Sequence, residues 1–199
     1  MMFMTGCSNN ITNRVYSCTT EDGSLMAIKL YDNGAILFSK ISTDIVRENK
    51  NLYMCYGHMD GAFYKRRGNI INVIENDEVI EIESNGLKYQ EMIFKPDNRF
   101  KEIKRVGKYA GKCYEAEFDN KKIYLVFIDN QELYMIAGYS DTGIYSYDIS
   151  KGKILINKLN IVLKEESSDY LIFDNDWVNI IFKFKENMTD YSLWEKNIL

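Results

Sequence analysis

Residues 52–63 read LYMCYGHMDGAF, and residues 133–145 return to this pattern as LYMIAGYSDTGIY, with six identities, one aromatic exchange and one inserted residue. The similarity extends into apolar segments on both sides. The matching pairs are Met26–Asn33 with Ile123–Asn130 and Met92–Lys95 with Ile180–Lys183. A pattern that recurs in this way indicates two copies of one structural unit.

Both copies have the sequence features of β-strands. Apolar residues alternate with others along segments such as Leu25–Tyr31 and, less cleanly, Glu78–Glu83, and the chain is rich in aromatic residues, with 15 Tyr and 10 Phe. Such residues suit a pleated, half-buried surface. The sequences Asp32–Gly34 and Ser84–Gly86 supply Asn and Gly, which tolerate the positive φ of tight hairpin turns. We therefore predict an all-β protein made of two sequence-related antiparallel meander units that form barrels or a β-sandwich.

The repeat divides the chain into four segments. Residues 1–13 form a signal remnant or tether, 14–98 the first β repeat, 99–187 the second, and 188–199 a C-terminal tail. Each repeat either closes its own barrel, or the two pool their strands in one larger barrel or sandwich. Because about 85 residues is small for an independent barrel, the sequence favours shared closure. A fragment ending near Arg99 is then expected to fold poorly.

The first repeat also contains about 16 additional residues, from Gly34 to Asn51, that have no counterpart in the second. Ile36–Phe38 within this stretch reads as one more strand, and Ser42–Lys50 reads as a polar loop. Because loops on a rigid β scaffold often carry function, this loop is a candidate functional segment.

The order of signals in the first repeat resembles the small lipocalin-like modules of bacterial lipoproteins. The residues that carry the resemblance are the Asp-Asn-Gly turn and its flanks (Ile28–Ile36), the strand from Gly61, the Gly-Asn hairpin at Gly68-Asn69, and the closing segment Ile93–Pro96. The resemblance covers about 70 residues of the first repeat and only the skeleton of the second. It implies lipocalin-like barrels and a binding role, and it carries over no catalytic residue.

The N-terminal residues add a second resemblance. Met1–Cys7 is apolar and ends in Thr5-Gly6-Cys7, followed by polar residues, and this resembles the lipobox of a bacterial lipoprotein signal. It lacks the basic region and the full apolar stretch of such a signal. The resemblance predicts lipidation of Cys7 and attachment to the bacterial cell envelope. The alternative is an ordinary cytosolic N-terminus that contains Gly-Cys.

The other cysteines are Cys18, Cys55 and Cys113. Cys18 and Cys55 lie in the first repeat and are a possible disulfide pair if they face each other on neighbouring strands. Cys113 lies roughly where Cys18 does in its own repeat. The alternative is that all three are small buried hydrophobic residues. Since there is no Cys-x-x-Cys spacing and only one histidine, a structural zinc site is not expected, and neither is another metal or a cofactor.

The sequence offers little to a catalytic interpretation. The single histidine, His58, precedes Asp60 by two residues, but its counterpart in the second repeat is Tyr139, whereas the turn-forming residues of the motif persist. Nucleophile-elbow, phosphate-loop and zinc-protease motifs are absent from the sequence. The net charge of −4 does not favour a nucleic-acid partner, and no apolar run is long enough to cross a membrane as a helix. We expect a protein that is not an enzyme.

Aromatic residues gather around the repeated motif in both units. Tyrosine offers a large, rigid contact area with a polar group, which suits ligand mouths and protein interfaces. The candidate binding residues for a ligand or partner are Tyr56, His58, Tyr64, Tyr139 and Tyr145.

The leading hypothesis is thus an envelope lipoprotein that binds a protein partner or a small apolar ligand, with an inhibitor or immunity role among the options. It would contact the membrane only through the lipid at Cys7. The alternatives are a cytosolic β-rich immunity or phage-derived accessory protein and a hydrolase with an unrecognised site.

Overall fold

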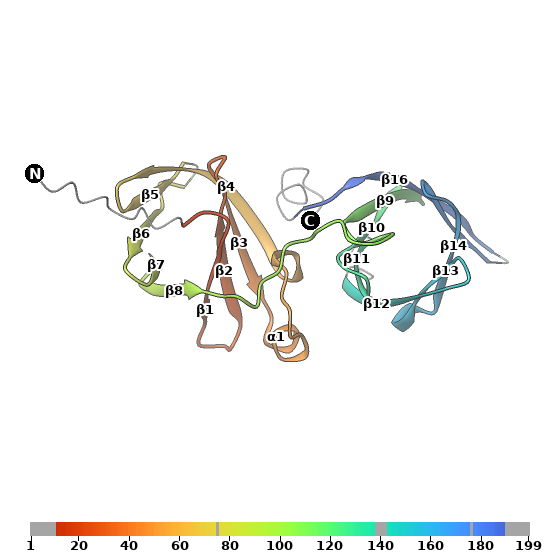
Figure 1. Ribbon diagram of the computed structural model, residues 1–199, viewed down its shortest axis with the longest axis horizontal. Helices are drawn as coiled ribbons and strands as arrows, with labels where there is room; N and C mark the ends of the chain where they lie inside the picture. Colours follow the sequence, from red (N-terminus) through yellow and green to blue (C-terminus); the bar gives the residue numbers. More distant parts are fainter. Residues whose placement is uncertain (1–10, 75, 138–142, 176, 190–199) are drawn as a thin grey trace, which may run out of the picture. The chain divides into compact units, whose positions relative to one another are not determined.

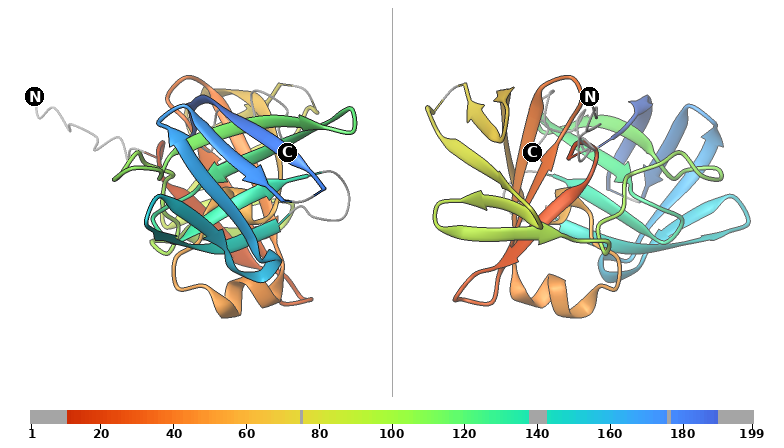
Figure 2. Two further views of the ribbon diagram at one scale, coloured as in Figure 1. Left: turned by 90° about the vertical axis from the view of Figure 1, so that its right-hand side faces the viewer. Right: turned by 60° about the vertical axis from the view of Figure 1, so that its left-hand side comes forward.

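The computed structural model describes residues 11–74, 76–137, 143–175 and 177–189, and divides into two compact units, residues 1–101 and 102–199. Each unit contains one closed antiparallel barrel of eight strands in sequence order (Figure 1). Figure 2 turns each barrel toward the reader in turn. The predicted all-β fold of two antiparallel meander units is confirmed.

The first barrel closes when its last strand pairs with its first, Tyr16 opposite Pro96 and Ser17 opposite Lys95. Its strands follow one another around the wall as a simple meander. They are β1 (Val15–Thr19), β2 (Leu25–Leu30), β3 (Ala35–Ile41), β4 (His58–Arg67), β5 (Ile70–Val73), β6 (Val79–Glu83), β7 (Gly86–Tyr89) and β8 (Met92–Pro96).

The second barrel closes in the same way, with Phe184 of its last strand opposite Tyr114 of its first. Between two of its strands lies the short 3-10 helix η2 (Asn157–Leu159). Its strands are β9 (Lys112–Phe118), β10 (Lys121–Phe127), β11 (Glu132–Ile136), β12 (Gly143–Ser150), β13 (Lys153–Ile156), β14 (Ile161–Ser167), β15 (Tyr170–Asp174) and β16 (Asn179–Asn187).

The expectation that the two repeats would pool their strands was wrong. Each unit supplies eight strands, and eight strands enclose an interior that side chains can fill. Since β1 pairs with β8 and β9 with β16, each barrel satisfies its own edges without strands from the other. The small size of each repeat is therefore sufficient for independent closure.

The additional stretch of the first unit lies between β3 and β4. Ile36–Phe38 belongs to strand β3, as predicted, whereas the expected polar loop contains the short helix α1 (Thr43–Glu48) and leads to the 3-10 helix η1 (Met54–Tyr56). The side chain of Ser39 on β3 donates a hydrogen bond of 2.7 Å to the Met54 carbonyl. This segment therefore packs against β3.

The flanks of the repeat are structurally equivalent in the two barrels. Leu30 pairs with Ile36 in the first barrel, and Phe127 pairs with Leu133 in the second. The same registers make Tyr16 equivalent to Tyr114 and Phe94 equivalent to Phe182. Strand alternation turns these residues inward, and each barrel has its own buried core.

The central motif is not equivalent, although its sequence similarity is the highest. Leu52–Met54 leads into η1 in the first unit, whereas Leu133–Met135 is part of strand β11 in the second. The residue that occupies the position of Leu133 in the first barrel is Ile36. The repeated Leu-Tyr-Met sequence thus adopts two different backbone conformations.

Candidate functional site

The interior of the second barrel contains a cavity of about 240 Å³. Every side chain around it is apolar. The lining residues are Ile123, Leu125, Met135, Ala137, Ile156, Leu159, Ile161, Leu163, Phe173, Ile180 and Phe182. Each barrel has two ends. The first strand begins and the last strand finishes at one of them, which we call the terminal end; we call the opposite one the far end. The cavity lies toward the far end.

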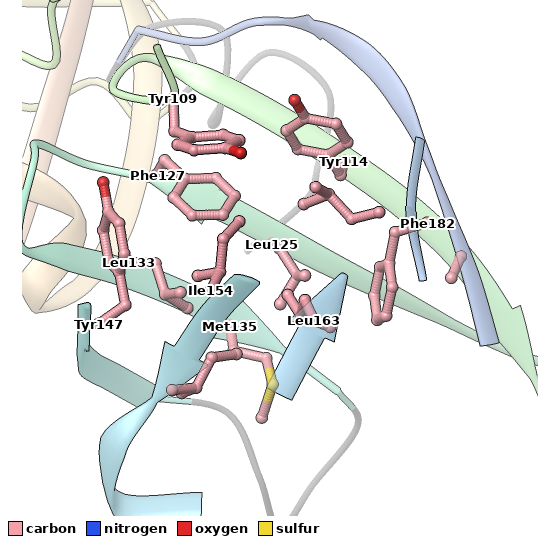
Figure 3. Close-up of a cluster of buried hydrophobic side chains, with 13 residues drawn as sticks. Tyr109, Tyr114, Leu125, Phe127, Leu133, Met135, Tyr147, Ile154, Leu163 and Phe182 are labelled. Carbon is pink, nitrogen blue, oxygen red and sulfur yellow. The ribbon is translucent and has the colours of Figure 1, made fainter. Parts of the chain in front are cut away.

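Strand alternation places these side chains. The cross-strand pairs Leu125 with Met135, and Leu163 with Phe173, direct their side chains to the same inner face of the wall. Leu125 and Leu163 are fully buried, and Met135 and Phe182 are only about 5% exposed. Figure 3 shows Met135 and Leu163 on the side of the core away from Tyr109 and Phe127.

The terminal end of the same barrel is closed by an aromatic plug, which consists of Tyr109, Tyr114, Phe127 and Tyr147. Tyr109 stacks on Phe127 with ring centroids 5.3 Å apart, and the edges of Tyr114 and Tyr147 meet Phe127 at 5.8 and 5.0 Å (Figure 3). Such pairs stabilise a core beyond the area they bury. The plug therefore leaves the space inside the barrel at the far end.

Hydrogen bonds fix two of the plug phenols. Tyr147 donates to the Asp129 carbonyl at 2.7 Å and Tyr114 to the Ser168 carbonyl at 3.1 Å. Burial raises the pKa of Tyr114 to about 12 and raises that of Tyr147 as well. Both phenols are therefore neutral at physiological pH, and their role is to hold the barrel wall together.

The first barrel fills the corresponding far end with aromatic rings. Phe38 of β3 and Tyr89 of β7 meet with centroids 5.5 Å apart, and Tyr89 lies 6.3 Å from Phe94. By register, the counterparts of Phe38 and Tyr89 are Met135 and Phe173. In the second barrel these two counterparts line the cavity.

The connection between the fifth and sixth strands of each barrel differs in polarity. Leu159 and Ile161 line the cavity of the second barrel. Ile80 of the first barrel is equivalent to Leu163 of the second, since their partners across the strands correspond. Counting back from these two residues, the positions of Leu159 and Ile161 are held in the first barrel by Asn76 and Glu78. The Glu78 carboxylate accepts hydrogen bonds of 3.3 Å from Asn76 and Gln90. The second barrel alone therefore extends its apolar interior into this connection.

The cavity has no side chain that could serve as a nucleophile, general base or metal ligand, since it holds only hydrocarbon groups and one thioether. Across the described part of the chain, no three His, Cys, Asp or Glu side chains gather in a way that could hold a metal ion. The arrangement can exclude water and enclose an apolar molecule.

The structure does not gather the predicted binding residues in one site. Tyr56 is buried in η1, and His58 is exposed at the start of β4. Tyr64 is partly buried inside the first barrel, where its hydroxyl donates to the Tyr31 carbonyl at 2.9 Å.

The other two predicted residues belong to the second unit. Tyr145 is partly buried against the second core and does not line the cavity, and Tyr139 lies outside the described residues.

The predicted disulfide is not formed. Cys18 points into the first barrel, where its Sγ lies 3.8 Å from the Met92 Sδ, whereas Cys55 lies in η1, outside strand β3. The barrel wall separates the two thiols. Cys113 does not occupy the position of Cys18, since Cys18 pairs with Met26 and its counterpart in the second barrel is Ala116.

Two observations concern the membrane. Cys7, the predicted lipidation site, lies outside the described residues. Within the described ranges, no helix has the length and apolar character needed to cross a membrane.

Sequence reasoning missed the cavity residues. The signal that could have found them is the alternation of Leu159, Ile161 and Leu163, three apolar residues at every second position from the end of η2 into β14, where the first repeat has two polar residues and Ile80. This signal can be recognised only when the strands of the two barrels are aligned by their registers. The alignment on the central motif instead matched Leu133 with Leu52, whereas the registers match it with Ile36.

Comparisons with models of protein families, with curated proteins and with solved structures found no match for this chain.

Proposed function

We propose that the protein is a binding protein that takes up a small apolar molecule in the cavity of the second barrel. The observation that carries the proposal is the uniformly apolar lining of a space of about 240 Å³ inside a closed barrel. A dry apolar cavity of about 150 Å³ is enough to bind benzene, and drug-sized pockets begin at about 300 Å³. The size favours a compact ring compound of one or two rings.

The expected affinity follows from the size of such a ligand. A molecule of about ten non-hydrogen atoms that buries nearly all its surface should bind with a dissociation constant of about 10–100 µM. Specificity for shape is expected to exceed specificity for polar groups, because no lining side chain offers a hydrogen-bond donor or acceptor stronger than the Met135 sulfur.

Isothermal titration calorimetry of the full chain with naphthalene tests the proposal. Met135→Phe introduces the residue that the first barrel has at the equivalent position, so its ring should reach toward Phe173 and fill the cavity. Naphthalene binding should weaken about tenfold or more in this variant. Val162→Phe is the matched control, because Val162 is 41% exposed on β14 and the added ring would face outward.

The proposal fails if naphthalene gives no saturable heat with the wild-type chain, or if both variants bind it equally well. Ala137→Leu, which also reduces the cavity, provides a second filled variant if Met135→Phe does not fold. Thermal unfolding of each variant shows whether its barrel is intact.

We further propose that the protein acts at a bacterial cell envelope through a lipid on Cys7, which the lipobox-like Thr5-Gly6-Cys7 supports. The intact mass of the protein from its native host tests this. A mature chain that starts at Cys7 and carries acyl chains would support the envelope location, and an unmodified chain would support the cytosolic alternative. The ligand-binding proposal does not depend on this result.

A further inference from the structure

Three sulfur-containing side chains lie together at the far end of the first barrel. Cys18 of β1, Met26 of β2 and Met92 of β8 all pack against the core inside this barrel. The Cys18 Sγ lies 3.8 Å from the Met92 Sδ. Met26 is the direct cross-strand partner of Cys18, so their Cβ atoms are about 5 Å apart on the same inner face. One thiol and two flexible thioethers are therefore within reach of a single point.

The second barrel has hydrocarbon side chains at all three positions. By register, the counterparts of Cys18, Met26 and Met92 are Ala116, Ile123 and Ile180. Ile123 and Ile180 line the apolar cavity. Since a barrel with the same strand order closes without sulfur at these positions, packing alone does not require the three sulfur atoms of the first barrel.

The spacing of the sulfur atoms suits a soft metal ion. At a metal–sulfur distance of about 2.3 Å, two ligands of a trigonal site lie about 4 Å apart, which is close to the measured 3.8 Å. Thiolate and thioether ligands select Cu(I), whereas Zn²⁺ is bound by thiolate, imidazole and carboxylate groups. Two thioethers beside one thiol therefore favour the cuprous ion over zinc.

The surroundings allow a cation to enter. Cys18, Met26 and Met92 are each only partly buried, so the sulfur cluster is accessible from solvent. Lys40 is the other cross-strand partner of Met26, but its ammonium group lies 3.3 Å from the Asp22 carboxylate. This ion pair offsets the repulsion that the lysine would exert on a bound cation.

We propose that the Cys18 Sγ and the Sδ atoms of Met26 and Met92 form a binding site for one cuprous ion. On binding, the Cys18 thiol releases its proton to solvent, and the thiolate and the two thioethers each donate one electron pair to the metal. Copper stays in the +1 state, and the complex has no net charge, which suits a partly buried position. The sequence-based expectation that no metal binds rested on cysteine and histidine and did not count thioethers.

Anaerobic competition between the full, reduced chain and the chromophoric chelator ferrozine for Cu(I) tests the site. The wild-type chain should hold one Cu(I) per molecule. Met26→Leu and Met92→Leu should each weaken Cu(I) binding about tenfold or more, and Cys18→Ala about a hundredfold or more.

The matched controls change sulfur atoms outside the cluster. Met59→Leu and Cys55→Ala replace buried residues that do not pack against the first core, and Cys7→Ser removes the N-terminal thiol. All three should leave the affinity for Cu(I) unchanged. X-ray absorption at the copper edge should show sulfur ligands alone, at about 2.3 Å.

Failure of the wild-type chain to hold Cu(I) would overturn the proposal. So would binding that both methionine variants leave intact, because the metal would then depend on a thiol alone. An equal loss in Cys55→Ala or Cys7→Ser would locate the copper at another cysteine, and a nitrogen ligand in the absorption spectrum would likewise exclude the all-sulfur site. Met→Leu exchanges conserve volume and should fold, so they test the site even if Cys18→Ala is unstable.

Discussion

Replacement of Phe127 by Ala should destabilise the second barrel by about 4 kcal/mol. Phe127 is fully buried, and its ring contacts those of Tyr109, Tyr114 and Tyr147 at centroid distances of 5.3, 5.8 and 5.0 Å. Truncation of a buried Phe to Ala costs about 3–5 kcal/mol, and each aromatic pair adds about 0.5–1.5 kcal/mol beyond the buried area. Partial collapse of the three tyrosines into the space keeps the total near the middle of this range.

Urea unfolding followed by near-ultraviolet circular dichroism measures the loss, because the clustered tyrosines give a signal that depends on their fixed packing. The unfolding midpoint of the second barrel should fall by about 2 M or more. Leu30→Ala, at the equivalent position of the first barrel, assigns the transitions, since it should shift the other one. Phe118→Ala is the surface control, because Phe118 is 46% exposed, and it should change stability by less than about 1 kcal/mol. A loss below about 1 kcal/mol for Phe127→Ala would refute the reasoning that the four rings form one close-packed plug.

Three further predictions concern the first barrel. A fragment of residues 1–101 should fold on its own and melt cooperatively in a calorimetric scan, since it contains all eight strands of the first barrel and the strand pair that closes it. A broad, non-cooperative melt would show that closure needs the second unit. Gly86→Ala should unfold or strongly destabilise this barrel, because a Cβ at this position would lie 2.1 Å from the Phe94 carbonyl oxygen. Gly152→Ala is the control: the space around Gly152 is open, so the substitution should cost only about 1 kcal/mol for its positive φ. Equal melting temperatures for the two variants would contradict this. Asp97→Asn should cost about 1 kcal/mol at pH 7, and urea titrations should show the difference shrinking as the pH falls from about 5 to 2. Burial raises the Asp97 pKa, but hydrogen bonds from Arg99 and Ser17 outweigh burial and hold the pKa below its usual value. The stability that the Asp97 carboxylate contributes is therefore present above about pH 4 and is lost as the pH falls through the folded pKa. A difference between Asp97→Asn and the wild type that does not depend on pH would argue against the ionic contact.

Much of the fold was readable from local pattern. Alternating segments such as Leu25–Leu30 form strands, and the turn sequence that ends at Gly34 forms a hairpin in which Gly34 has a φ of 85°. These features depend on neighbouring residues, so a single sequence contains them. The duplication was also readable, because Met26–Asn33 and Ile123–Asn130 hold equivalent positions in the two barrels.

The candidate sites were not readable, and the reason lies in register. The Leu-Tyr-Met motif suggested one alignment of the repeats, yet Leu52–Met54 leads into a 3-10 helix and Leu133–Met135 lies in a strand. Tyr56 and Tyr145, chosen from that alignment, therefore fall at unrelated places.

The sequence by itself determined that this chain is a duplicated β protein, because strand alternation, turn residues and repetition are properties of short segments. Only the tertiary structure decided how many barrels form, because closure depends on which strand pairs with the first one. It also decided where space remains inside each barrel. Phe38 meets Tyr89 across the first interior, whereas Met135 and Phe173 border a cavity in the second. Such a difference arises from side chains far apart in the sequence that face one another only after the barrel has closed.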